Sequence, residues 1–372
     1  WKEMCSSEMP TDAWKTFFKN MFLENLMSYS LMILMVMMTI TMGQYACMYF
    51  QYMHQRTHVA KYKFKNKLFY STKLNNNYDF KKWLVGFTDG DGTFSMYMNK
   101  DLSKIQFMYK ISQSRINIQL LYKMKSKLGV GKVKMDNNSN MCSYLIRDRK
   151  LLLKHMMPMF DEYPLLTTKR YNYLKFRTCL ILLENDKELN YKEKMTKVQK
   201  MCLQTPPKDY ISDIWLTNLN KKINSKLETW SMEDISNIMS KYWLIGFMEA
   251  EGSFFLVNKE KDRMVHAFGM SQKTDSIVLY GMKRLLHISS SILYKEKYDY
   301  YKLETTNSRS IERIINYFSD KNTLSYSKSY TLGMKNLEFR LWARSYKKHK
   351  GDFCKLSMIR KSIRKMRENN NL

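Results

Sequence analysis

The chain has 372 residues, with 63 Lys and Arg against 34 Asp and Glu, a formal net charge of +29, and 44% hydrophobic residues. This apolar content excludes a disordered basic tail protein, and the length exceeds that of one comfortable core, so we expect two domains or one duplicated domain. The charge is typical of a nucleic-acid-binding body, with an anionic membrane surface or a ribosomal location as alternatives. The six Cys form no CxxC pair, so we predict neither a disulfide framework nor a zinc site.

The N-terminal residues 1–58 differ from the rest of the chain because they carry four basic and four acidic side chains and no net charge. From Asn25 to Gln55 no residue is charged, and a bilayer needs only about 20 apolar residues to be crossed. We therefore predict a hydrophobic extension with a membrane helix at about 25–53. A buried helix from an upstream extension of the reading frame is the alternative. A basic linker, 59–80, follows.

An internal repeat begins after this linker. Residues 83–92 read WLVGFTDGDG and residues 243–252 read WLIGFMEAEG, an offset of 160 positions. Two further landmarks keep nearly the same distance from the last acid of each motif. The pairs are Gln113 and Gln272, at 22 and 21 residues, and Lys169 and Lys328, at 78 and 77 residues. Three landmarks in register indicate a duplicated domain.

Each copy follows the same order of predicted elements: a helix, two strands, a helix, two strands and a closing helix. Alternating apolar residues predict the strands, and helical spacing predicts helices at about 116–128 and 275–286. The expected organisation is a first repeat at 81–184, a linker at 185–240, a second repeat at 241–345 and a basic C-terminal tail at 346–372.

The first helix of each copy carries small residues four apart, a spacing that lets two helices approach backbone to backbone. These residues are Gly86 and Gly90 in the first copy and Gly246 and Ala250 in the second. If the two helices pair, the final acids Asp91 and Glu251 project side by side. We expect Gly92 and Gly252 to leave the helices in left-handed turns.

Two carboxylates at the negative ends of helix dipoles repel each other and favour a bound cation. Oxygen ligands of this kind suit Mg²⁺, which supports in-line phosphodiester displacement. The earlier acids Asp89 and Glu249 lie on another helical face and are interpreted as structural, bonding to nearby backbone. Trp83 and Trp243 are interpreted as core anchors.

The motifs LVGFTDGDG (84–92) and LIGFMEAEG (244–252) resemble those of the LAGLIDADG homing endonucleases and intron maturases with two motifs on one chain, over about 80–345. The resemblance implies an α+β fold of two αββαββα repeats related by a pseudo-two-fold axis, with saddle-shaped antiparallel sheets over the DNA major groove. It implies that Asp91 and Glu251 bind the catalytic metals. It further implies catalytic contacts to metal-bound water, from Gln113, Gln272, Lys169 and Lys328.

Simpler interpretations remain for the last four residues: the glutamines as exposed strand ends and the lysines as phosphate contacts. Basic residues on the predicted strands are candidates for reading bases or phosphates. They are Lys100, Lys104, Lys110, Lys132, Lys134, Lys259, Arg263, Lys295 and Lys302. The basic C-terminal run would add salt-dependent affinity for a nucleic-acid backbone.

The sequence and the resemblance together predict a monomeric, Mg²⁺-dependent endonuclease that hydrolyses double-stranded DNA at a specific site and is encoded within an intron. Abundant Met, Lys, Asn and Tyr favour an AT-rich mitochondrial genome, with the protein on the matrix side and associated with the inner membrane through its N-terminal segment. The alternatives are an RNA maturase that assists group I intron splicing, alone or together with cleavage, and a non-catalytic component that binds mitochondrial ribosomal RNA.

Overall fold

The structure, a computed structural model, describes residues 79–99, 101, 103–185, 190–218, 230–319 and 331–368. The predicted N-terminal extension, its helix at 25–53 and nearly all of the linker 59–80 lie outside these residues, as do Lys100 and Lys328. Within the described part of the chain, no helix combines the length and apolar character needed to cross a membrane.

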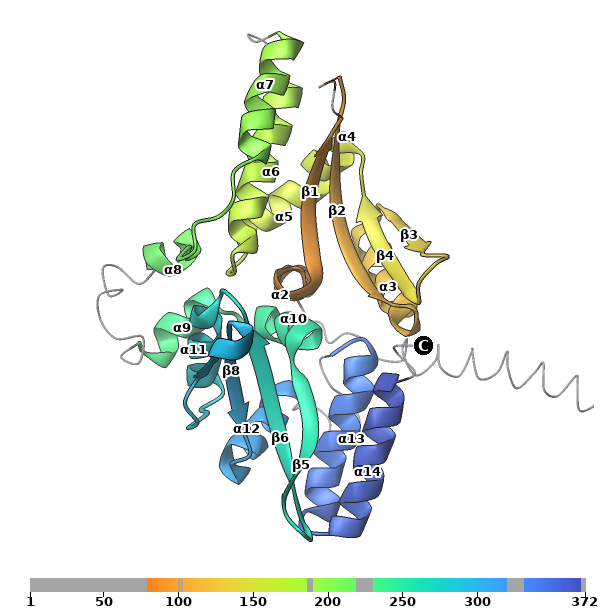
Figure 1. Cartoon of the computed structure of the whole chain (residues 1–372), viewed down its shortest axis with the longest axis vertical. Coiled ribbons are helices and arrows are strands. Elements are labelled where there is room, and N and C mark those ends of the chain that lie inside the picture. The colour runs from red at the N-terminus through yellow and green to blue at the C-terminus, as the bar shows by residue number, and fades with distance from the viewer. Residues whose placement is uncertain are drawn as a thin grey trace, which may run out of the picture. The chain divides into compact units, whose positions relative to one another are not determined.

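The first repeat folds as an antiparallel sheet with strand order β1-β2-β4-β3, covered on one face by helices (Figure 1). Its elements are α2 (Phe80–Asp91), β1 (Gly92–Met98), β2 (Ile105–Ser114), α3 (Ile118–Leu128), β3 (Lys132–Met135), β4 (Met141–Ile146), α4 (Arg149–Leu151), α5 (Met157–Glu162) and α6 (Lys169–Asn185). Alternate residues of β2, among them Phe107, Tyr109 and Ile111, are buried against the helices. The period of two in the sequence therefore sets which face of the sheet is apolar.

The second repeat has the same topology, with strand order β5-β6-β8-β7. Its elements are α10 (Lys241–Glu251), β5 (Ser253–Glu260), β6 (Arg263–Gln272), α11 (Ser276–Leu285), β7 (Leu293–Lys295), β8 (Tyr300–Thr305), α12 (Ser308–Phe318) and α13 (Met334–His349). The predicted duplicated α+β fold is confirmed. Each copy has additional helix before its closing helix, α4 and α5 in the first and α12 in the second, which the expected αββαββα order lacks.

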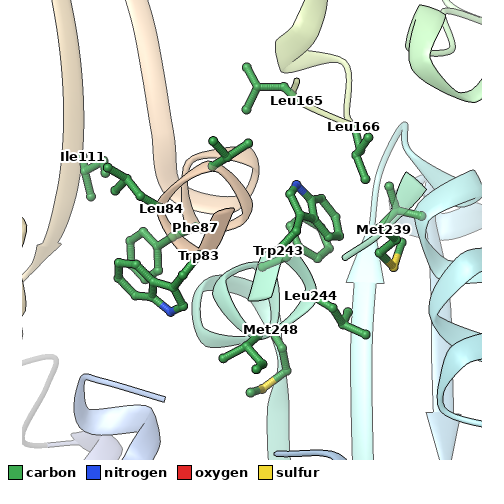
Figure 2. Packing of buried hydrophobic residues seen from close by; sticks show 14 of the residues in the cluster. Trp83, Leu84, Phe87, Ile111, Leu165, Leu166, Met239, Trp243, Leu244 and Met248 are labelled. Carbon is green, nitrogen blue, oxygen red and sulfur yellow. The ribbon is translucent and has the colours of Figure 1, made fainter. Parts of the chain in front are cut away.

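The two repeats meet through α2 and α10, which pack closely along their length (Figure 2). A Cβ atom at Gly86 would lie 1.9 Å from the carbonyl oxygen of Trp243, and one at Gly246 would lie 2.0 Å from that of Trp83. The absence of a side chain at these positions is therefore what permits the backbone contact. Both Trp side chains are buried beside the helix pair, as predicted.

The glycines that follow the two helices play a different role from the one predicted. Gly92 has φ −81° and Gly252 has φ −73°, both in extended conformation, so the left-handed turns expected there are wrong. A Cβ at Gly92 would lie 2.8 Å from the Thr88 carbonyl oxygen, and one at Gly252 would lie 2.6 Å from that of Met248. Lack of space, and not backbone torsion, disfavours a side chain there.

The segment between the repeats was expected to be a linker, but much of it is packed structure. It contains α7 (Tyr191–Cys202), α8 (Asp213–Asn218) and α9 (Met232–Ile238). Trp215 is fully buried, and its indole N–H donates to the Leu166 carbonyl oxygen at 2.9 Å. Isolated aromatic residues fix this polar stretch to the core. The high charge of the segment makes them hard to recognise from the sequence.

The C-terminal basic segment is also structured. Residues of the predicted basic tail, 346–372, continue α13 and then form α14 (Phe353–Glu368), which lies beside α13 (Figure 1). Leu356 and Ile363 of α14 are buried, and Leu356 packs on Leu256 and Met264 of the β5–β6 hairpin. Apolar residues seven apart in a basic run give this helix a face that can be buried.

Candidate active site

The centre of the site is formed by the last residues of α2 and α10. Because the helices pair, Asp91 and Glu251 lie next to each other: a Cβ at Gly90, one residue before Asp91, would lie 3.2 Å from Cγ and 3.6 Å from Oε1 of Glu251. Burial raises the pKa of both carboxyl groups, and the charge of Asp91 raises the pKa of Glu251 further. The site thus concentrates negative charge in a poorly hydrated place, where a cation would be attracted.

A chain of amide side chains orients Asp91. The Nε2 group of Gln113, at the end of β2, donates to Oδ2 of Asp91 at 2.5 Å. Asn117 in turn donates from Nδ2 to Oε1 of Gln113 at 2.9 Å, and this fixes which amide atom of Gln113 faces the carboxylate. The structure therefore brings Gln113 to Asp91.

Gln272 occupies the corresponding strand end in the second repeat, paired with Tyr301 across β6 and β8. It is half-buried, and it makes no side-chain hydrogen bond within the described ranges. The two halves of the site therefore differ: Gln113 is engaged with the acid of its repeat, whereas Gln272 is not. This asymmetry has no signal in the two similar sequences.

Lys169 begins α6 and reaches back across the first repeat to the end of α2. Its Nζ donates to the Thr88 carbonyl oxygen at 3.2 Å and to that of Gly90. Burial lowers the pKa of Lys169, while the nearby carboxylates of Asp89, Asp91, Glu251 and Asp275 act in the opposite direction. The lysine lies where it can balance the charge of both motif acids.

The second repeat also places a lysine near the two motif acids. Lys328 lies outside the described residues, and Lys335 on α13 occupies the position equivalent to Lys169. Lys335 follows Leu332 by three residues, as Lys169 follows Leu166, and its charge lowers the pKa of both Asp91 and Glu251. The role of Lys328, predicted from the match of LLTTK to LSYSK, stays a prediction.

The backbone contacts of the earlier acids define this equivalence. Asp89 is buried and accepts hydrogen bonds from the Leu166 N–H at 2.8 Å and the Thr167 N–H at 3.1 Å. Glu249 is buried likewise and accepts from the N–H groups of Leu332, at 2.7 Å, and Gly333. Each acid fixes the turn that precedes the lysine of its own repeat, which confirms the structural role predicted for both.

Each acid also binds the tryptophan of the opposite repeat. The indole N–H of Trp243 donates to Asp89 at 2.8 Å, and that of Trp83 donates to Glu249 at 3.1 Å. Four buried groups thereby tie the two repeats together in a pseudo-symmetric pattern. Burial raises the pKa of Asp89 to about 6 and that of Glu249 to about 7, since desolvation outweighs these hydrogen bonds.

Two further residues hold the lysine turns from the opposite repeat, and sequence reasoning missed both. Asp275, before α11, accepts from the Thr168 N–H at 2.7 Å and from its hydroxyl at 2.9 Å. Asn117, before α3, accepts from the Met334 N–H at 2.9 Å. Asn and Asp at these positions usually cap their own helix, but neither does so here. The signal that could have identified them is an Asn or Asp a few residues after each predicted glutamine, just before a predicted helix.

The donor set fits a hard divalent cation that keeps several water ligands. Asp91 and Glu251 offer carboxylate oxygens, and no group of three or more His, Cys, Asp or Glu that could enclose a metal occurs among the residues described. Mg²⁺ is commonly held by one or two carboxylates, with water and substrate phosphate completing its coordination. The two acids would provide the protein share of such a site.

Five of the basic residues predicted to contact DNA lie on the sheet faces opposite the helices. Lys110 pairs with Leu145, which also pairs with Lys132, and Lys134 lies two residues further on the same face. On the second sheet, Lys302 and Lys295 share the face of Ser271. Lys104 lies just before β2, while Lys259 and Arg263 lie at the β5–β6 turn. Lys302 and Arg263 also pair with Glu304 and Glu260.

The topology and this site define a two-motif LAGLIDADG architecture, and sequence comparison agrees. The LAGLIDADG endonuclease family matches residues 84–180 and 244–344, and the chain belongs to this family. A relative, the probable intron-encoded endonuclease Cox1-I1b of Schizosaccharomyces pombe, is 32% identical over 305 residues, which are 80% of this chain and 72% of the relative.

Other relatives are longer. The probable intron-encoded endonuclease aI3 of Debaryomyces hansenii is 26% identical over 301 residues, 74% of this chain and 40% of the relative. The uncharacterized mitochondrial protein RF1 of Saccharomyces cerevisiae is 29% identical over 220 residues, 57% of this chain and 41% of the relative. The chain thus spans about two fifths of the length of these two proteins.

Solved structures share the fold. I-GzeII in complex with its DNA target has a TM-score of 0.59 at 20% identity, covering 76% of this chain and 97% of that one. I-SmaMI bound to uncleavable DNA has a TM-score of 0.58 at 22% identity, covering 80% and 99%. The paired helices and two four-stranded sheets are therefore the architecture of these meganucleases.

Proposed function

We propose that the protein cuts both strands of a specific DNA duplex by metal-dependent phosphodiester hydrolysis. The observation that carries this proposal is the juxtaposition of Asp91 and Glu251 at the ends of the paired helices. Two acids from two repeats, related by the pseudo-symmetry of the fold, suit two scissile phosphates on opposite strands. Family membership and relatives named as intron-encoded endonucleases support the same conclusion.

The residues around the two acids have distinct tasks in this reaction. Bound Mg²⁺ would supply charge stabilisation for the attacking and leaving oxygens of an in-line displacement. Asp91 and Glu251 would hold the cation, and Gln113 keeps the Asp91 carboxylate oriented. Lys169 and Lys335, fixed by the turns that bind Asp89 and Glu249, offset negative charge that develops at the phosphate.

DNA binding is assigned to the outward faces of the two sheets. Strand-borne lysines, including Lys110, Lys132 and Lys134, would contact bases and phosphates of a major groove wide enough for a β-ribbon. One chain supplies both halves of the site, so the active form is a monomer. The intron-encoded and mitochondrial names of the relatives support a mitochondrial setting, with an exon junction lacking the intron as the target.

The test is cleavage of duplexes selected from a randomised library by the purified chain in Mg²⁺, followed by mapping of both cut strands. The proposal requires one preferred sequence, cuts on both strands and no products without a divalent cation. Absence of cleavage together with support of group I intron splicing in vitro would instead establish the maturase alternative.

A further inference from the structure

The C-terminal helix α14 is fixed along the free edge of β5, a strand with only one neighbour, β6. Arg367 donates from Nη2 to the Phe254 carbonyl oxygen at 2.8 Å, and Arg360 donates from Nη1 to Oδ1 of Asn258 at 3.0 Å. Together with the buried Leu356 and Ile363, these contacts hold one side of the helix against the sheet. The arginines of α14 are therefore held at a defined place along the edge of β5.

The arginines of α14 reach the sheet face that points away from the helices. Phe254 and Leu256 are buried against the core, so Ser253, Phe255 and Val257 face the opposite side. A pocket at this edge is lined by these three outward residues, by Leu256 and Ile363 from the buried side, and by Arg360, Arg364 and Arg367. This is the face that carries Lys295 and Lys302. The basic surface of the second sheet thus continues around its edge onto α14.

The charge of this rim is poorly compensated. Helix α14 carries six Lys and Arg and one acid. Arg367 is paired with Glu338 at 3.0 Å, whereas Arg360 binds a neutral amide. Arg364 is exposed and forms no ion pair within the described ranges. A guanidinium in this setting presents the planar fork that binds phosphate oxygens in pairs.

The corresponding edge of the first repeat has no arginine on its flanking helix, α7. There α7 follows α6 as α14 follows α13, but the pocket beside β1 receives only Tyr191 from α7. Tyr191 is committed to the Ser103 carbonyl oxygen at 2.9 Å. Arg149 in that pocket is bonded to Glu184 at 3.0 Å, whereas Lys104 and Arg147 are exposed and form no ion pair within the described ranges. Within the described residues, three arginines on the flanking helix, of which only Arg367 is in an ion pair, are therefore particular to the second repeat.

We propose that Arg360, Arg364 and Arg367 bind the phosphate backbone of duplex DNA that flanks the half-site read by the second sheet. The rim lengthens the DNA interface on one side only, so the footprint is asymmetric about the two scissile phosphates. This inference rests on the proposed function, because the sheet faces must carry the duplex for the rim to meet its flank. Duplex DNA is favoured over RNA because the rim is continuous with the sheet surface assigned to the major groove.

The test compares Arg364→Gln with Lys365→Gln, which removes the same charge from the next exposed position, outside the pocket. Affinity for the selected target duplex is measured in Ca²⁺ at several salt concentrations, with each flank shortened in turn. Arg364→Gln is expected to weaken binding several-fold and to reduce the slope of log affinity against log salt by about 0.9, the value of one phosphate contact. In the wild-type chain, shortening one flank of the duplex should lower the DNA affinity. Arg364→Gln should abolish this dependence on flank length, and Lys365→Gln should leave it unchanged.

If the two substitutions had equal effects, or if affinity depended equally on both flanks, the α14 arginines would not bind flanking DNA as proposed. The proposed function would remain intact. A loss confined to binding of a group I intron transcript would also overturn the proposal for these arginines, since the partner would then be RNA. Failure of the wild-type chain to bind any duplex would overturn the proposed function itself. Urea unfolding of both variants checks that the exposed substitutions leave stability unchanged.

Discussion

The backbone contact between α2 and α10 makes a sharp prediction for Gly86→Ala. The new Cβ would lie 1.9 Å from the carbonyl oxygen of Trp243, whereas real contacts of this kind need about 3.2 Å, so the helices would have to separate by more than 1 Å. No flexible side chain can yield at this point, because the obstacle is backbone. We expect a loss at or above the upper end of the ~1–3 kcal/mol typical of overpacked cores.

The matched control is Gly281→Ala in α11. Its Cβ would lie 2.9 Å from Cε of Met239, the far end of a side chain that can move, and 3.2 Å from Cη2 of Trp215, so only side chains have to yield; alanine also favours helix over glycine by ~1 kcal/mol. Thermal unfolding of the two variants should differ clearly, since each kcal/mol shifts Tm by about 2–4 °C in a body of this size. Cleavage by Gly86→Ala should fall further than its DNA affinity, because separated helices move Asp91 from Glu251.

A Gly86→Ala protein as stable and active as Gly281→Ala would refute this reasoning. It would mean that the repeats are held mainly by other contacts and that the distance between the two acids tolerates helix separation. A loss of stability with unchanged cleavage at low temperature would contradict only the expected link between helix separation and cleavage.

Three further outcomes are expected. Lys335→Ala should reduce cleavage at saturating DNA by at least ~10-fold, as Lys169→Ala should, because each offsets charge at the phosphate; single-turnover rates unchanged by Lys335→Ala would contradict the equivalence. Asp275→Ala should lower the cleavage rate more than DNA affinity by freeing the Thr168 turn, and Asp275→Asn should restore part of it; equal losses in both quantities would argue against positioning. His266 is buried against Ser345, and burial lowers its pKa to about 4. Its contribution to the free energy of unfolding should therefore be complete above pH ~6.5 and fall by ~3 kcal/mol toward pH 4, and denaturation curves of His266→Gln should lack this pH dependence.

Much of the architecture could be predicted because the residues that reveal the duplication are ones that the fold requires at fixed positions. Gly86, Gly246 and the motif acids recur at fixed spacing, and the alternation in β2 and β6 identifies the buried sheet faces. These features depend on local pattern and on one internal comparison. The helix pair and the adjacency of Asp91 and Glu251 follow from them directly.

The remaining features depend on contacts between distant segments. The equivalence of Lys335 to Lys169 could not be predicted, because the connection before α13 is longer than its counterpart before α6 and only the bonds to Glu249 reveal the register. Asn117 and Asp275 resemble ordinary helix caps until the opposite repeat is seen to bind them. Basic composition likewise concealed the buried face of α14, because two apolar residues in a run of lysines and arginines are a weak local signal.

The central claim is that the two motif acids together hold the catalytic metal. It is tested most directly by Asp91→Asn combined with Glu251→Gln, assayed on the selected target duplex for cleavage in Mg²⁺ and for binding in Ca²⁺. Cleavage of both strands is expected to disappear while duplex affinity stays within a few-fold of the wild type. A double variant that still cuts either strand at a rate near that of the wild-type protein would contradict it.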